Sequence, residues 1–373
     1  MMRRTLAVLA WLLPCVAVAC AGAASAGAAV AGAADAEPVT LTRGINVTNW
    51  FRYPASRDPA VLAKYLSDQA LADLHQAGFD FMRLAVDPEM VAGDAPGAVL
   101  IGAIRRIQAH GLAVVVSPHP RAWHLETDAA DRDRLLAFWR ELAPKLAVLD
   151  QTRTLPEVLN EPVFPNDPAG WAALQHRVLG AIRQALPRAT VVLTGNDWGG
   201  VGGLLALTPE ADRNVLYSFH FYDPAELTSL AAYRQDVDHA ALGRLPFPVD
   251  QGLNCNATAD ATADPPTRDL MHYYCSLSWD APRIGAAFDR AVAWSRQHDV
   301  RLMVGEFGAS ADLNAPARLA WLKAVRGTAE FRKIGWALWG YDDVMGFALP
   351  RQPNVRPVLN PAILSALGMA VAK

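Results

Sequence analysis

The sequence predicts a (β/α)8 barrel, a TIM barrel formed by a single domain. Eight short apolar runs rich in Val, Ile and Leu alternate with longer amphipathic segments, which is typical of parallel strands joined by helices. The 373 residues are 52% hydrophobic and 19% charged, which excludes a disordered or fibrous protein. Fewer strands would give an open doubly wound sheet, but the phosphate-binding glycine fingerprint that would favour that fold is absent from the sequence.

The expected strands and helices follow one another along the chain in βα order. Gly78 and Gly111 each follow a helical pattern and precede a strand, as glycines just past a helix do. The tail from 356 to 373 is expected to be a final helix that closes the barrel. The predicted strands are 41–47, 81–86, 113–117, 157–160, 190–194, 215–219, 301–305 and 335–339, and the predicted helices are 60–77, 97–110, 130–149, 168–186, 281–298 and 314–327.

One long connection, from about 223 to 280, follows the sixth strand. It is polar, rich in proline, and contains Cys255 and Cys275. Loops longer than about 12–15 residues are usually functional or disordered. A disulfide between these cysteines favours an ordered cap beside the barrel mouth, and a loop of that size gains about 3 kcal/mol in the chain-entropy model. A zinc site is disfavoured because neither cysteine has a CxxC partner.

The first 36 residues have the pattern of a signal peptide followed by an alanine-rich leader. Arg3 and Arg4 precede a short apolar run and a tract of small residues. The run is too short for a comfortable membrane span. Cys20 lies in a weak lipoprotein-like box, so it is either discarded or lipidated. We therefore expect a secreted or periplasmic protein, with the catalytic domain at 37–373 and an oxidising environment that suits the disulfide.

Charge and aromatic content narrow the class of ligand. The formal net charge is −3, without the basic surplus of a nucleic-acid binder. The 11 Trp residues suggest exposed aromatic platforms, with a plain large core as the alternative. Low charge with many Trp fits a neutral sugar ligand.

Two carboxylates, Glu161 and Glu306, each come directly after an apolar strand-like run. Barrel active sites lie at the carboxyl ends of the strands. Two carboxyl groups facing each other there suit glycoside hydrolysis, in which one protonates the leaving oxygen and the other attacks the anomeric carbon or activates water. The alternative is a pair of unrelated carboxylates in separate salt bridges.

An ordered set of motifs surrounds these two residues and covers nearly the whole chain after the leader. It comprises Arg-Gly-Ile-Asn at 43–46 with Asn-Trp-Phe at 49–51, Arg-Leu at 83–84, Leu-Asn-Glu-Pro at 159–162, His-Phe-Tyr at 220–222, Gly-Glu-Phe-Gly at 305–308 and Trp-Ala-Leu-Trp at 336–339. In content and order this set resembles glycoside hydrolase family 5, the cellulase-type family of clan A.

The resemblance implies a retaining double displacement, with Glu161 as general acid/base and Glu306 as nucleophile. It implies carboxyl groups about 5–5.5 Å apart, with Glu161 protonated and Glu306 ionised before the reaction. Arg83 would steady the Glu306 carboxylate by a charge-assisted contact, unless it forms a structural ion pair instead. Tyr222 would donate to Glu306 and hold its rotamer, and Asn160 would hydrogen-bond the sugar 2-hydroxyl.

Further residues are expected to surround the sugar. His119 and His220 would line the −1 subsite, although lone histidines are often structural. Trp339 would stack under the −1 ring, because an aromatic face suits the apolar C–H face of a pyranose. Outer subsites are expected from a set for which core packing is the alternative: Trp50, Trp123, His124, Trp198 and Trp279.

The sequence thus predicts a retaining β-glycoside hydrolase, with endo action favoured on a β-linked glucan or related exopolysaccharide. Rival activities on the same site are a β-mannanase, an exo-β-glucosidase and a transglycosylase. A rival of another class is a non-catalytic polysaccharide-binding or export-accessory protein. We expect a monomer with no cofactor. His119 and His124 lack the usual metal-ligand spacings, and no G-x-S-x-G motif supports a serine hydrolase.

Overall fold

The predicted barrel is present in the computed structural model, which describes residues 39–249, 253–349 and 357–370. Eight parallel strands form one sheet in the order β4-β3-β2-β1-β8-β7-β6-β5. An isolated parallel bridge between Glu157 and Val192 joins the two ends of this sheet, and the Val158 amide donates to the Val192 carbonyl oxygen at 3.0 Å. The sheet is therefore a nearly closed barrel.

The strands agree with the sequence-based ranges except at the first and the fourth. Predicted strand 41–47 begins and ends later, and pairs with β2 through a shift in register between Val47 and Phe51. Predicted strand 157–160 is wrong, because the paired residues lie three positions earlier. The strands are β1 (Arg43–Phe51), β2 (Phe81–Val86), β3 (Ala113–Pro118), β4 (Thr154–Pro156), β5 (Val191–Thr194), β6 (Val215–Phe221), β7 (Arg301–Phe307) and β8 (Gly335–Leu338).

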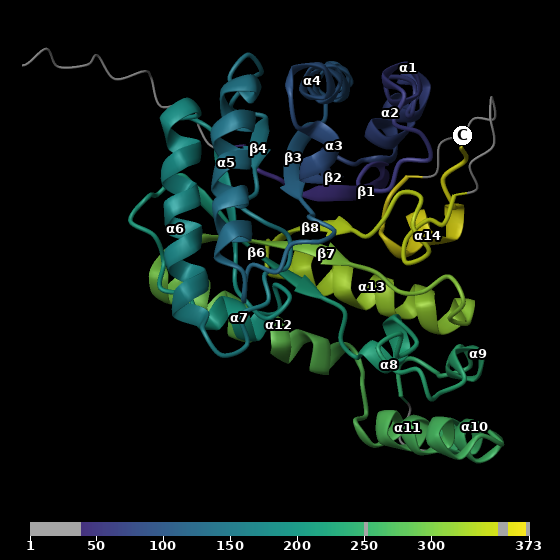
Figure 1. The fold of residues 1–373 in the computed structure, drawn as a ribbon. Helices are drawn as coiled ribbons and strands as arrows, with labels where there is room; N and C mark the ends of the chain where they lie inside the picture. Colours follow the sequence, from purple (N-terminus) through teal and green to yellow (C-terminus); the bar gives the residue numbers. More distant parts are fainter. Residues whose placement is uncertain (1–38, 250–252, 350–356, 371–373) are drawn as a thin grey trace, which may run out of the picture. The chain divides into compact units, whose positions relative to one another are not determined.

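Helices surround the strands, as Figure 1 shows. Most of them begin at an Asp, Asn or Ser whose side chain accepts from the first turn, which satisfies amides that a helix leaves unpaired. The helices are α1 (Pro59–Leu62), α2 (Asp68–Ala77), α3 (Pro88–Val91), α4 (Asp94–Ala109), α5 (Ala129–Leu146), α6 (Pro168–Ala185), α7 (Val201–Leu205), α8 (Ala225–Thr228), α9 (His239–Leu242), α10 (Leu253–Asp260), α11 (Pro265–Ser276), α12 (Ala281–His298), α13 (Ala315–Phe331) and α14 (Pro361–Ala366).

Side chains along each strand point alternately outward to the helices and into the barrel, and those that point inward lead to the site. On β2, Met82 and Leu84 join the large apolar layer between strands and helices, whereas Phe81 belongs to a smaller cluster inside the barrel. The next inward residue after Phe81 is Arg83. On β4 the same step leads from Leu155, inside the barrel, to Glu157. The small apolar cluster thus fills one end of the barrel interior, and charged residues follow it at the carboxyl ends of the strands.

The connection between β6 and α12 is helical rather than a plain loop. It contains α8, α9, α10 and α11, and the predicted disulfide joins Cys255 in α10 to Cys275 in α11, with 5.7 Å between the Cα atoms. The cap is anchored near the barrel mouth, where the Ser310 amide after β7 donates to the Thr228 carbonyl oxygen at 2.7 Å. Figure 1 shows α10 and α11 beyond α8 and α9, so the bridge stabilises the outer part of the cap.

The expected leader, Cys20 and parts of the tail lie outside the described residues. The described residues cluster as one compact unit. Among the residues that the structure describes, no helix is long and apolar enough to cross a membrane.

Candidate active site

The two predicted catalytic carboxylates lie together at the carboxyl ends of the strands. Glu306 is the penultimate residue of β7 and is buried, whereas Glu161 follows β4 and keeps 29% of its side chain exposed. A carboxylate oxygen of each lies within 4.8 Å of the other. Glu161 has a φ of +38°, a left-handed conformation that is uncommon for a residue with a side chain and is concentrated at functional sites.

Arg83 is the hub of the buried charges under these carboxylates. It donates from Nε and Nη2 to both oxygens of Glu157, at 2.6 and 2.8 Å, and from Nη1 to Glu306. Nη2 also donates to Asn160 Oδ1 at 2.8 Å. Burial alone would lower the pKa of Arg83, but the charges of Glu157 and Glu306 raise it. The guanidinium is therefore a fixed positive charge that holds Glu306 in place.

Asn46 on β1 completes the support of Arg83. Its Oδ1 accepts from Arg83 Nη1 at 2.9 Å, and its amide nitrogen donates to the carbonyl oxygens of Gly305 at 3.1 Å and Leu338 at 3.2 Å. This one side chain therefore ties its own strand, β1, to β2, β7 and β8 at the level of the site. Gly305 is required there, because a Cβ atom would lie 2.2 Å from Ser218 Oγ.

Two residues of the β6 motif contact the carboxylates directly. His220 Nδ1 lies 2.9 Å from Glu161 Oε1 and 3.5 Å from Glu306 Oε2, and Tyr222 donates to Glu306 Oε2 at 3.0 Å. Burial alone would lower the pKa of His220, but the charge of Glu306 and the contact with Glu161 raise it. Burial and the charge of Glu306 raise the pKa of Tyr222 well above its usual value, so the phenol keeps its proton.

Burial raises the pKa of Glu306, while the positive charges of His220 and Arg83 oppose that rise. The negative charge of Glu161 raises it further, and the hydrogen bond from Tyr222 lowers it. The resemblance implied an ionised Glu306, and this rise in its pKa runs against that expectation, because the barrel removes Glu306 almost completely from water.

His119 and Trp339 are both nearly buried and pack against each other. Their rings are stacked with centroids 5.8 Å apart, and His119 Nε2 lies 3.1 Å from Ser117 Oγ. Burial, followed by the charges of Arg52 and Arg83, lowers the pKa of His119 well below its usual value. Its Nδ1 is buried and has no hydrogen-bond partner among the described residues. The imidazole is therefore held neutral inside the protein, with one ring nitrogen facing Ser117.

A cleft of about 220 Å³ opens beside Glu161. Its aromatic residues include Trp198, which is 57% exposed, and the partly buried Trp123. Both tryptophans lie at the cleft, and their part in outer subsites stays a prediction. The cleft is lined by Arg52, His119, Pro120, Trp123, Leu125, Glu126, Leu159, Asn160, Glu161, Pro162, Val163 and Trp198.

Three residues expected in the outer subsites are not at the cleft. Trp50 is fully buried, donates to the Leu62 carbonyl oxygen at 2.8 Å and stacks on Tyr65, so core packing explains it. Trp279 is 9% exposed and belongs to the main apolar core. His124 has a largely exposed side chain 3.8 Å from Glu126 and does not line the cleft.

Sequence reasoning missed the roles of Glu157 and Arg52. Glu157 was assigned to a strand by its apolar neighbours, although a charged residue within such a run signals a buried partner such as Arg83. Arg52 lines the cleft, and its guanidinium lies 5.9 Å from the centroid of the Trp339 ring.

Glu161, His220 and Glu306 offer three potential ligand atoms within 4.8 Å of one another, so this trio also has the spacing of a cation site.

Comparisons with known proteins agree with this geometry. The family model described as cellulase (glycosyl hydrolase family 5) matches residues 38–343. Endoglucanase 3 of Fibrobacter succinogenes is 24% identical over 81% of this chain, and this chain covers 49% of its length. Endoglucanase C of Acetivibrio thermocellus is 23% identical over 81% of this chain and 92% of its own length.

Solved structures share the fold. The endoglucanase Cel5A of Thermotoga maritima superposes with a TM-score of 0.70 at 22% identity, over 88% of this chain and 97% of that one. The cellulose synthase subunit Z of Clostridioides difficile superposes with a TM-score of 0.69 at 22% identity, over 88% and 99% of the two chains. Because the family model spans most of the sequence, the chain belongs to glycosyl hydrolase family 5, the cellulase family.

Proposed function

We propose that this protein is a retaining endo-acting β-glycoside hydrolase that cleaves a β-linked glucan or a related exopolysaccharide. The observation that carries the proposal is the approach of Glu161 and Glu306, whose oxygens lie within 4.8 Å. Retaining enzymes place the two carboxyl groups about 5–5.5 Å apart, whereas inverting enzymes leave about 6.5–9.5 Å for a water molecule. The observed separation therefore favours direct attack by a carboxylate.

In the first step the Glu306 carboxylate attacks the anomeric carbon while Glu161 donates its proton to the leaving oxygen. A glycosyl ester on Glu306 and a shortened sugar chain result. In the second step Glu161 takes a proton from water, the hydroxide adds to the anomeric carbon, and the ester bond to Glu306 breaks. Arg83 and Tyr222 hold Glu306 in the attacking geometry, and His220 contacts both carboxylates.

The substrate class is supported by the cleft and by the relatives. Trp198 and Trp123 line the cleft and offer aromatic faces, and Asn160 and His119 line it with hydrogen-bonding groups. The similar proteins named endoglucanase favour a β-glucan. A β-mannan is the second candidate, because Cel5A of Thermotoga maritima has been solved with both cellobiose and mannotriose.

Location outside the cytoplasm is part of the proposal. The Cys255–Cys275 disulfide supports it, because such bonds persist in oxidising compartments. Expression of the full chain followed by fractionation tests this point. Recovery of all the protein in the cytoplasm with both thiols free would contradict it.

A panel of soluble β-glucans, mannan and their oligosaccharides, with sizing of the products, tests the function. We expect rapid loss of polymer length on one β-glucan and no turnover by Glu306→Ala, because the covalent step has no substitute nucleophile. Exposed Glu141, which pairs with Lys145 on α5, provides the matched control Glu141→Ala. Equal turnover by Glu306→Ala and the wild type would refute the proposal, and turnover of no glycan would favour a binding protein.

A further inference from the structure

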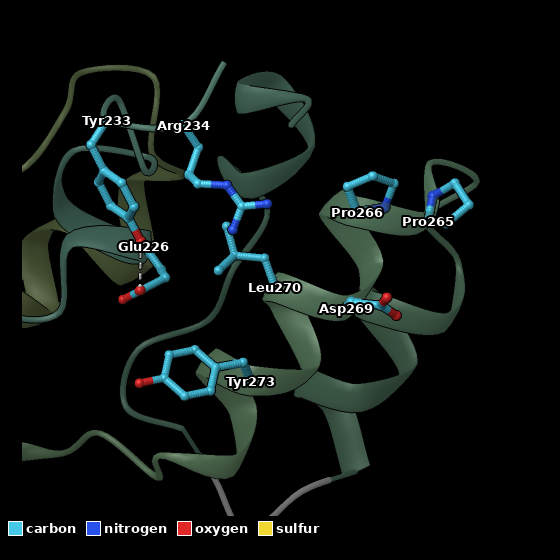
Figure 2. A pocket seen from close by; sticks show the side chains of 8 residues that line it. All are labelled: Glu226, Tyr233, Arg234, Pro265, Pro266, Asp269, Leu270 and Tyr273. Atoms are coloured by element: carbon cyan, nitrogen blue, oxygen red, sulfur yellow. Dashed lines mark hydrogen bonds between the residues drawn. The ribbon is translucent and has the colours of Figure 1, made fainter. Parts of the chain in front are cut away.

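A second cavity, of about 690 Å³, lies in the cap that follows β6. Figure 2 shows that it is bordered by α11 on one side and by Tyr233 and Arg234 on the other, with Glu226 of α8 at one end. Its volume is within the range of about 300–1,000 Å³ that is usual for ligand pockets. It shares no lining residue with the cleft beside Glu161.

One face of α11 forms the floor of this cap pocket. Its lining residues recur one helical turn apart, so they lie on the same side of the helix. Leu270 is buried in that face, whereas Tyr273 at its end is 53% exposed. The face comprises Pro265, Pro266, Asp269, Leu270 and Tyr273.

The opposite wall presents a second tyrosine and fixed charges. Tyr233 is 61% exposed, and its hydroxyl donates to Glu226 Oε1 at 3.0 Å. Glu226 itself is only 8% exposed. Arg234 is held by Asp236 through two contacts of 2.6 Å. The pocket therefore combines two exposed aromatic rings with carboxylate acceptors and guanidinium donors whose positions are restrained.

This combination matches the surface of a pyranose. Aromatic rings cover the apolar C–H faces of a sugar, and carboxylates and guanidinium groups bond its hydroxyls. An exposed tyrosine also loses little conformational entropy when it binds, because its ring has only two rotatable bonds. An apolar ligand would bring no hydrogen-bonding groups for Asp269 or for the remaining lone pairs and N–H groups of Glu226 and Arg234.

We propose that the cap pocket is a second carbohydrate-binding site, which holds a β-linked glucan chain away from the catalytic carboxylates. The choice of ligand rests on the proposed function. The cap joins the active site through Thr228, whose hydroxyl donates to the Tyr222 carbonyl oxygen and whose own carbonyl oxygen accepts from Ser310. A polymer held by the cap pocket is thereby kept near the barrel mouth, which raises its local concentration there.

The test distinguishes binding at the cap pocket from binding at the catalytic cleft by blocking the catalytic cleft. The enzyme is treated with 2,4-dinitrophenyl 2-deoxy-2-fluoro-β-cellobioside, which should leave a fluoroglycosyl ester on Glu306 and release dinitrophenolate. The labelled enzyme is then run in native gels that contain hydroxyethyl cellulose, and its retardation gives an affinity for the polymer. The variants are Tyr273→Ala and Tyr273→Phe, with Phe331→Ala as a control at an aromatic residue that is 84% exposed elsewhere.

We expect the labelled enzyme to remain retarded, with affinity about three- to tenfold weaker in Tyr273→Ala and nearly unchanged in Tyr273→Phe and Phe331→Ala. Hydrolysis of an aryl β-cellobioside should be equal in all of these variants, which also verifies folding. Loss of retardation on labelling, or equal retardation of Tyr273→Ala and the control, would overturn the second site. Failure of the probe to label Glu306 would instead count against the proposed function, and the cap pocket would then be judged on unlabelled protein by the same variants.

Discussion

Arg83 donates to both carboxylate oxygens of Glu157, at 2.6 Å from Nε and 2.8 Å from Nη2, deep inside the barrel. This pair is fully enclosed, with side-chain exposures of 1% and 0%. Because Arg83 also contacts Glu306, the buried pair sets where the proposed nucleophile lies. We therefore expect the stability of the barrel and the proposed catalysis to depend on the same guanidinium.

Glu157→Ala should lower the free energy of unfolding by about 3–5 kcal/mol, since it removes a major partner of a buried charge. Urea unfolding followed by tryptophan fluorescence measures the loss. The control is Glu141→Ala, whose exposed pair with Lys145 should contribute much less. Equal losses in the two variants would mean that the buried pair is not a principal stabilising contact.

Tyr222→Phe should move the acid limb of the kcat/KM profile to higher pH. Glu306 must be ionised to attack, and the Tyr222 hydrogen bond lowers the pKa of that carboxyl. Without the bond the pKa rises further, so a higher pH is needed to ionise the group. At the optimum, kcat/KM should also fall about tenfold or more. Tyr273→Phe, in the cap pocket, is the control and should leave the acid limb where it is in the wild type. An acid limb of Tyr222→Phe that does not move, or a shift of the same size in Tyr273→Phe, would contradict this role.

Trp198→Ala should weaken the binding of long substrates without impairing the chemical step. Trp198 is 57% exposed and lines the cleft near Glu161. We expect KM for a soluble β-glucan to rise about three- to tenfold at nearly unchanged kcat. Trp339→Ala, at the ring stacked on His119, should lower kcat as well. A fall in kcat alone for Trp198→Ala would remove it from substrate binding.

Reduction of the Cys255–Cys275 bond should lower the stability of the cap by about 3 kcal/mol, because the bond closes a 20-residue separation. Thermal unfolding with and without dithiothreitol measures this effect. The double variant Cys255→Ser and Cys275→Ser should be insensitive to dithiothreitol. A wild type that also shows no response would indicate that the bond does not limit unfolding.

The sequence predicted the barrel because short apolar runs separated by amphipathic segments are local patterns that can be read along the chain. It placed the fourth strand at 157–160, whereas the paired residues are Thr154–Pro156, and Pro156 cannot donate to a ladder. In the structure this strand is a short one at an end of the sheet, where proline is tolerated.

The site was predictable where chemistry and motif coincide, as at Glu161, Glu306 and Tyr222. The burial of individual side chains was not predictable from the sequence, because no local pattern distinguishes Trp50 in the core from Trp198 at the cleft. The role of Glu157 was missed for a related reason. That role depends on its contact with Arg83, which is distant in sequence and lies beside Glu157 only in the folded barrel.

The anomeric configuration of the first product tests the central claim most directly. Proton NMR of a β-glucan oligosaccharide during the first minutes of hydrolysis, before mutarotation, distinguishes the two anomers of the new reducing end. A separation of Glu161 and Glu306 within 4.8 Å predicts the β anomer, formed by two successive inversions. Initial appearance of the α anomer would contradict attack by Glu306 and the account of the site built on it.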